Sequence, residues 1–246
     1  MNWPSRWALL VTATIGPTAL VMVACAGSDA DTPTRTGPAV VTIESQTCRR
    51  PQARLGVGTV LADGVALTAA HVVDEQLRRL EVDGRPARVV ASSAKTDLAL
   101  VAAETSSERT IDAARRWFDT IEGASPVPVA APSAVTIVAA DGLVPTTVER
   151  VVTLRVDDVS AGVVHERGAL VLDAEVRPGD SGSPVVGAAG DVVGVVVLRR
   201  RDESSSYASR IPPLPPPTDL AADQQRNTMY SGGSAAEPVA PTEPCT

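Results

Sequence analysis

The sequence predicts an all-β protein of two six-stranded antiparallel β-barrels joined by one short helix. Between residues 39 and 212, short segments rich in valine and isoleucine alternate with turn signals. Dipeptides such as Asp63-Gly64 and Asp83-Gly84 favour tight hairpin turns. A single stretch of helical periodicity interrupts the strands near the middle of the chain. The predicted domain between the terminal segments is therefore one unit of about 170 residues with two lobes.

The first barrel is expected at about 39–105 and the second at about 125–212. The strand segments of the first barrel are 39–43, 56–61, 65–67, 80–82, 87–90 and 98–102. Those of the second are 127–129, 135–139, 147–156, 163–176, 185–186, 192–198 and 207–209. All are short and β-branched, as strands of small barrels are.

A connecting helix is expected at about 106–122. Ile111, Ala114, Trp117 (or Phe118) and Ile121 recur at helical spacing, and Gly123 follows where a helix would end. We expect Trp117 to anchor this helix by packing rather than to bind a ligand.

The most informative chemical signal is the segment Gly179-Asp180-Ser181-Gly182, which holds one hydroxyl between two glycines. Glycines allow a sharp turn, and the backbone N–H groups of Gly179 and Ser181 could converge beside the hydroxyl. That is the layout of a nucleophile with an oxyanion hole. The same four residues alone also fit an ordinary turn between strands.

A serine nucleophile needs a base and a group that orients the base. The chain has two histidines. His71 follows an apolar strand segment, whereas His165 is expected to be a surface residue of a strand. Asp97 leads directly into an apolar run, where a carboxylate is costly unless it is paired.

These segments resemble a known family. Thr68-Ala69-Ala70-His71, Asp97-Leu98-Ala99-Leu100 and Gly179-Asp180-Ser181-Gly182-Ser183-Pro184, in this order, resemble the signature segments of trypsin-like (chymotrypsin-fold) serine proteases. The resemblance covers about residues 39–212 and is strongest to the secreted bacterial, Deg-like branch, here without a PDZ domain. The order of the three residues differs from those of subtilisins and α/β-hydrolases.

The resemblance implies a serine endopeptidase whose active site lies between the barrels. Ser181 would be the nucleophile, His71 the general base and Asp97 the group that orients His71. The N–H groups of Gly179 and Ser181 would form the oxyanion hole. Ser183 departs from the family, which usually has glycine there. A catalytically silent binding module of the cell envelope is therefore the alternative, and esterase-like hydrolysis at the same site is a third.

The primary specificity stays open. In the resembled family the residue six before the nucleophile, here Glu175, lies at the base of the specificity pocket. A buried carboxylate there would favour a basic substrate side chain. The arginines at 199–201 would favour acidic peptides instead, or could neutralise Glu175. Asp180 is expected to be held by another group, with Arg177 as the candidate.

The termini predict export. Residues 1–24 form a secretory signal, and the small residue before Cys25 resembles a lipobox, which implies a lipid-anchored chain. Simple secretion or an uncleaved anchor are the alternatives. Residues 25–38 form a tether, and 213–246 a proline-rich tail that is either a stiff extended arm or a docking segment.

The three cysteines fit this picture, because lipidation of Cys25 would leave Cys48 and Cys245 as a disulfide pair. The alternative is two unpaired thiols. The net charge of −7 argues against nucleic acid as a partner. Two distant histidines and no Cys-x-x-Cys give no metal site, and no cofactor is expected. The expected partners are a peptide or protein substrate and, through the lipid, a membrane; no oligomeric state is predicted.

Overall fold

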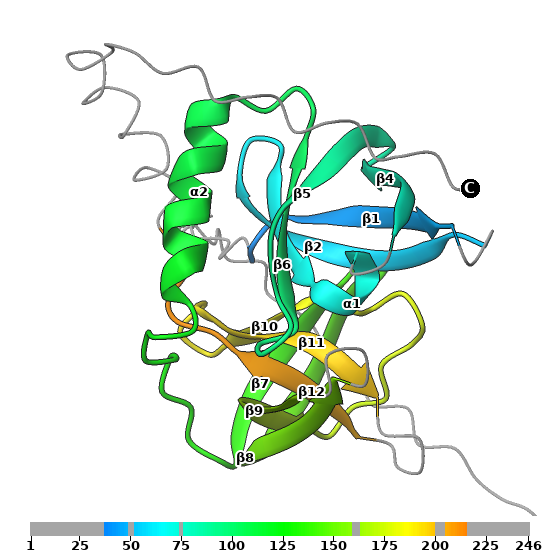
Figure 1. The fold of residues 1–246 in the computed structure, drawn as a ribbon. Helices are drawn as coiled ribbons and strands as arrows, with labels where there is room; N and C mark the ends of the chain where they lie inside the picture. Colours follow the sequence, from blue (N-terminus) through cyan, green and yellow to red (C-terminus); the bar gives the residue numbers. More distant parts are fainter. Residues whose placement is uncertain (1–36, 49–51, 74–75, 159–162, 200–204, 216–246) are drawn as a thin grey trace, which may run out of the picture. The chain divides into compact units, whose positions relative to one another are not determined.

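A computed structural model describes residues 37–48, 52–73, 76–158, 163–199 and 205–215. Its strands form two closed barrels of six antiparallel strands each (Figure 1). The predicted fold class is thus confirmed. The predicted signal segment, the tether to residue 36 and the tail beyond residue 215 lie outside the described residues.

The first barrel has the strand order β1-β2-β3-β6-β5-β4, and pairing of β4 with β1 closes it. Its strands are β1 (Val40–Thr47), β2 (Arg54–Ala62), β3 (Val65–Ala69), β4 (Leu77–Val82), β5 (Arg85–Ser93) and β6 (Leu98–Ala103). A single helical turn, α1 (Ala70–Val73), follows β3 and was not predicted. Strands β3 and β6 are buried at every position, which explains their continuous apolar sequences.

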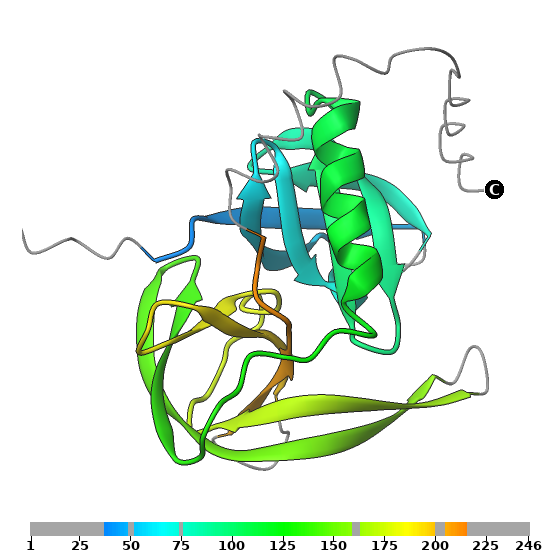
Figure 2. The same cartoon turned by 90° about the vertical axis from the view of Figure 1, so that its left-hand side faces the viewer.

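The second barrel has the order β10-β11-β12-β9-β8-β7. Its strands are β7 (Ser133–Ala139), β8 (Gly142–Asp158), β9 (Val163–Leu172), β10 (Pro184–Gly187), β11 (Val192–Arg199) and β12 (Ser206–Arg210). The long β8–β9 hairpin is the yellow-green arm of Figure 2.

The largest differences from the prediction in the second barrel concern the segment 127–129, the start of β8 and the end of β9. The segment 127–129 is not a strand, because Val127 contributes one backbone hydrogen bond, to the carbonyl of Ile211 (2.9 Å). Strand β8 begins earlier than expected, since the turn at 140–141 already pairs Ala139 with Gly142. Strand β9 ends at Leu172, after which the chain enters the loop that carries Ser181.

Helix α2 (Glu108–Thr120) lies where the connecting helix was predicted, alongside the first barrel (Figures 1 and 2). The Ser107 side chain caps it by accepting the N–H of Thr110 at 3.2 Å. Trp117 is half-buried against the core and donates its indole N–H to the carbonyl of Pro213 at 3.3 Å. It therefore packs the start of the proline-rich segment onto α2.

The two barrels share part of their core. One apolar cluster joins Leu67 and Leu100 of the first barrel and Ile111 of α2 with Val195 and Ile211 of the second. Two backbone hydrogen bonds of 2.8 Å also hold the loop of Ser181. The N–H of Val57 in β2 donates to the carbonyl of Ser181, and the N–H of Gly182 donates to the carbonyl of Val196 in β11. The loop is consequently fixed against strands of both barrels.

Candidate active site

The pairing of β3 with β6 brings His71 and Asp97 together. Ala69 is opposite Leu98 in this register, so the residues that follow β3 meet those that precede β6. The backbone N–H of His71 donates to Oδ1 of Asp97, and its ring Nδ1 lies 3.0 Å from Oδ2. Both carboxylate oxygens are therefore engaged by the same histidine.

Asp97 has a left-handed backbone, with φ of +56°. Aspartate tolerates this region better than most residues, but the conformation still needs support from its surroundings. That support comes from hydrogen bonds to the preceding turn. The N–H of Thr96 donates to Ser93 Oγ (3.3 Å), and Ser209 Oγ of β12 donates to the carbonyl of Thr96 (2.5 Å).

The loop before Ser181 contains a tight turn. The N–H of Asp180 donates to the carbonyl of Arg177 (3.0 Å), and Gly179 between them has φ of +105°. Proline at the second position and a positive φ at the third define a type II turn. No backbone carbonyl of the described residues accepts the N–H of Gly179 or Ser181.

The partner of Asp180 was predicted only in part. Its carboxylate accepts the backbone N–H of Arg177 at 2.6 Å. The guanidinium of Arg177 instead pairs with Asp141 at 3.0 Å. The Asp180 carboxylate is thus held by a backbone N–H of its own turn and not by the side chain of Arg177.

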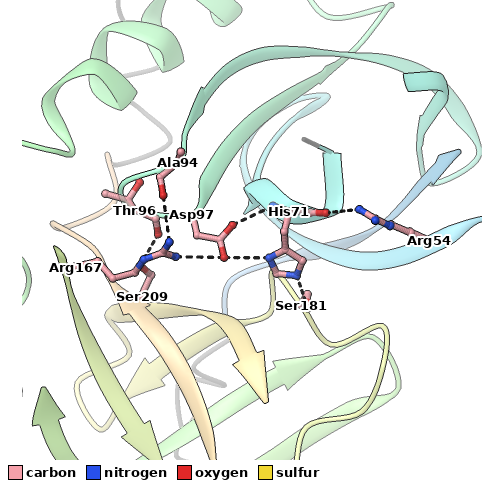
Figure 3. A network of polar contacts seen from close by, with 8 residues as sticks. All are labelled: Arg54, His71, Ala94, Thr96, Asp97, Arg167, Ser181 and Ser209. Carbon is pink, nitrogen blue, oxygen red and sulfur yellow. Dashed lines mark hydrogen bonds and ion pairs between the residues drawn. The ribbon is translucent and has the colours of Figure 1, made fainter. Parts of the chain in front are cut away.

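Ser181 completes the arrangement. Its Oγ lies 3.0 Å from Nε2 of His71 (Figure 3). His71 and Asp97 belong to the first barrel and Ser181 to the second, and the side chains of His71 and Asp97 differ in solvent exposure. The His71 side chain is 44% exposed, whereas that of Asp97 is 13% exposed. The imidazole is therefore accessible from solvent while its carboxylate partner is largely covered.

Arg167 of β9 is a member of the site that we did not predict. Its Nη1 lies 3.2 Å from Oδ2 of Asp97, and its side chain is 5% exposed. Its Nη2 donates to the carbonyl of Ala94 at 3.1 Å. The sequence did hold a signal: strand periodicity places Arg167 on the same face as the buried residues Ala169 and Val171.

Ser183 is fully buried, its N–H donates to the carbonyl of Asp180, and its hydroxyl has no hydrogen-bond partner within the described residues. Glu175 is exposed, which differs from a buried carboxylate at the base of a pocket. The neighbouring Val176 is buried in its place.

Other predicted residues lie apart from this arrangement or outside the described part. His165 is half-buried on β9, opposite Val156. Cys48 follows β1, while Cys25 and Cys245 are outside the described residues. The same holds for the side chains at 199–201. In the described ranges, no three His, Cys, Asp or Glu side chains could hold a metal ion together. None of the helices described there has the length and apolar character needed to cross a membrane.

Two six-stranded barrels with a histidine between an aspartate and a serine where they meet define the class of chymotrypsin-fold serine peptidases. A sequence profile of the trypsin-like peptidase domain matches residues 56–195, and this chain belongs to that family. A comparison with curated proteins finds no match.

Solved structures give the same fold. The active form of the Rv3671c protease from M. tuberculosis is 22% identical, with a TM-score of 0.53 over 85% of this chain and 86% of that one. The inactive form of the Rv3671c protease is 21% identical, with a TM-score of 0.51 over 77% and 88% of the two chains.

Proposed function

We propose that this protein is a serine endopeptidase that hydrolyses peptide bonds through an acyl-enzyme on Ser181. The observation that carries the proposal is the His71 imidazole, which lies 3.0 Å from both Asp97 and the Ser181 hydroxyl. These are the distances at which a base can take the proton of a nucleophile and be oriented by a third group.

The mechanism follows from these contacts. Asp97 accepts Nδ1–H of His71, which leaves Nε2 as the acceptor of the Ser181 proton. As Oγ bonds to the substrate carbonyl carbon, the charge that develops on the carbonyl oxygen is stabilised by the N–H groups of Gly179 and Ser181. His71 then protonates the leaving amine. A water molecule, deprotonated by His71, attacks the acyl carbon, and His71 returns this proton to Ser181 Oγ as the acyl group leaves.

Labelling with a fluorophosphonate probe tests the activated serine. We expect the wild-type protein to react and the Ser181→Ala and His71→Ala variants not to react, because each lacks one half of the proton transfer. Circular dichroism and thermal melting check that both variants are folded. Hydrolysis of a peptide library by wild type, absent in Ser181→Ala, then distinguishes a peptidase from an esterase.

Failure of well-folded wild type to label would contradict the active-enzyme proposal. It would favour a catalytically silent binding module of the cell envelope. A variant ending at Pro215 separates this outcome from a site covered by residues 216–246, since removing a cover would restore labelling.

We further propose that the protein is exported, anchored by lipid on Cys25, and linked by a Cys48–Cys245 disulfide. The signal-like segment, the lipobox resemblance and the cysteine count support this. Intact mass of mature protein from its native membrane tests both features. A diacylated Cys25 adds the mass of its lipid, and reduction adds two hydrogen atoms when a disulfide is present. A Cys48→Ser variant is the control, because its mass should not respond to reduction.

A further inference from the structure

We propose that Arg167 is a positioning residue for the reaction at Ser181: it fixes the Asp97 carboxylate from the opposite barrel and limits the negative charge that His71 experiences. The proposal rests on the proposed function, because it concerns the same site. Arg167 does not face the reacting atoms. It acts through Asp97.

The contact crosses between the barrels. Arg167 lies on β9 of the second barrel, and Asp97 lies immediately before β6 of the first. Nη1 is 3.2 Å from Oδ2, an ion pair without the geometry of a directed hydrogen bond. A buried guanidinium is costly unless it is paired. Asp97 is the ion-pair partner that the described residues provide for it.

Arg167 and His71 share one oxygen of this carboxylate. Oδ2 of Asp97 faces Nδ1 of His71 at 3.0 Å and Nη1 of Arg167 at 3.2 Å (Figure 3). Oδ1 accepts the backbone N–H of His71. The carboxylate is therefore held by two N–H groups of His71 and by the ion pair with Arg167, which leaves it little freedom to rotate away from the imidazole.

The second barrel also holds the turn before Asp97. Arg167 Nη2 donates to the carbonyl of Ala94, and Ser209 of β12 donates to that of Thr96. Strands β9 and β12 are hydrogen-bonded neighbours. They form one rigid platform for this turn, whose last residue has a left-handed φ. The orientation of the carboxylate thus depends on correct docking of the barrel that carries Ser181.

The charge of Arg167 has a second consequence. Its guanidinium offsets part of the negative charge that Asp97 places beside the His71 imidazole, and such short contacts are weakly screened when buried. Removing the guanidinium therefore changes both the position and the charge balance of the carboxylate that orients His71.

Other charged groups near the site do not confuse this test. Arg54 of β2 donates from Nη1 to the His71 carbonyl at 2.8 Å. Lys95, in the turn itself, pairs with Glu122 at 3.8 Å. Neither contact involves Arg167 or the Asp97 carboxylate, so a change of labelling rate in the Arg167 variants reports on Arg167.

The test is the second-order rate of fluorophosphonate labelling at neutral pH for wild type, Arg167→Gln and Arg167→Lys. We expect Arg167→Gln to label about 10- to 100-fold more slowly, the effect on activity of losing a group that orients a metal ligand. Lysine keeps the charge but not the planar fork, so Arg167→Lys should label faster than Arg167→Gln and more slowly than wild type.

Arg155→Gln is the matched control, because this arginine of β8 is 73% exposed on the same hairpin. It should label as wild type does. An Arg167→Gln variant that labels like wild type overturns the proposal. So does labelling of Arg167→Lys as slow as that of Arg167→Gln, because a role in packing alone would not depend on the charge. If Arg167→Gln does not fold, Arg167→Lys decides, and a wild-type rate in that variant overturns the proposal. Failure of wild type itself to label would instead contradict the proposed function.

Discussion

Replacement of Gly182 by alanine is expected to prevent the chain from reaching a stable native state. An added Cβ would lie 1.8 Å from the carbonyl oxygen of Val57 and 2.5 Å from Oγ1 of Thr68. Neither neighbour can move easily. Val57 N–H is bonded to the Ser181 carbonyl, and Thr68 is buried and donates to the Val57 carbonyl at 2.7 Å. The φ of +93° at Gly182 adds backbone strain.

The expected loss is more than about 4 kcal/mol, a range that single substitutions rarely reach and a large share of the stability of an ordinary domain. Chemical denaturation followed by circular dichroism measures it. Gly84→Ala is the matched control. Gly84 has φ of +71°, yet a Cβ there would meet nothing within 4 Å, so strain alone should cost about 1–2 kcal/mol. Equal losses of unfolding free energy in the two variants would contradict the prediction, because the close contact with Val57 would then add nothing to the cost of backbone strain.

Short-range patterns in the sequence account for most of the fold. The turn at Asp83-Gly84, with φ of +48° and +71°, forms where the dipeptide predicted it. Helix α2 follows the apolar spacing from Ile111. The incorrect secondary-structure predictions arise where contacts between residues distant in the sequence determine the local structure. The segment 127–129 has strand-like residues but finds one backbone partner, and α1 forms because its chain must turn between β3 and the next strand.

The same distinction applies to the site. His71, Asp97 and Ser181 lie in short segments that resemble a family signature, so they could be found without coordinates. Arg167 could not be assigned in this way, because its role depends on which strand of the second barrel faces Asp97. The position of Glu175 was taken from the family resemblance, and its exposure depends on the path of the loop between β9 and Ser181, which the sequence does not specify.

Asp97→Asn is expected to lower kcat by about 10,000-fold, since a misoriented base is lost as a proton acceptor. In the native site Oδ1 accepts the His71 N–H, and Oδ2 faces Nδ1 and Arg167. The asparagine amide has an NH₂ group in place of one carboxylate oxygen. In either orientation of the amide, this NH₂ group faces another hydrogen-bond donor. If that donor is Nδ1–H, the ring must change tautomer, and Nε2 then carries a proton and cannot accept that of Ser181. The measurement is peptide hydrolysis or labelling beside wild type, and near-normal activity would contradict the orienting role.

The same substitution should also destabilise the fold, because it leaves the buried charge of Arg167 uncompensated. Removing one partner of a buried pair costs about 3–5 kcal/mol, and the 13% exposure of Asp97 favours the lower end. Asparagine tolerates the left-handed φ of position 97, so backbone strain does not add to this.

A double variant, Asp97→Asn with Arg167→Met, separates the two effects. Replacing a buried ion pair by uncharged groups is often neutral for stability, so the double variant should be more stable than Asp97→Asn alone. It should remain inactive, because methionine restores no acceptor for Nδ1–H. Denaturation of the four proteins completes the cycle. If the double variant loses as much unfolding free energy as the two single variants together, Arg167 and Asp97 are not energetically coupled across the barrels.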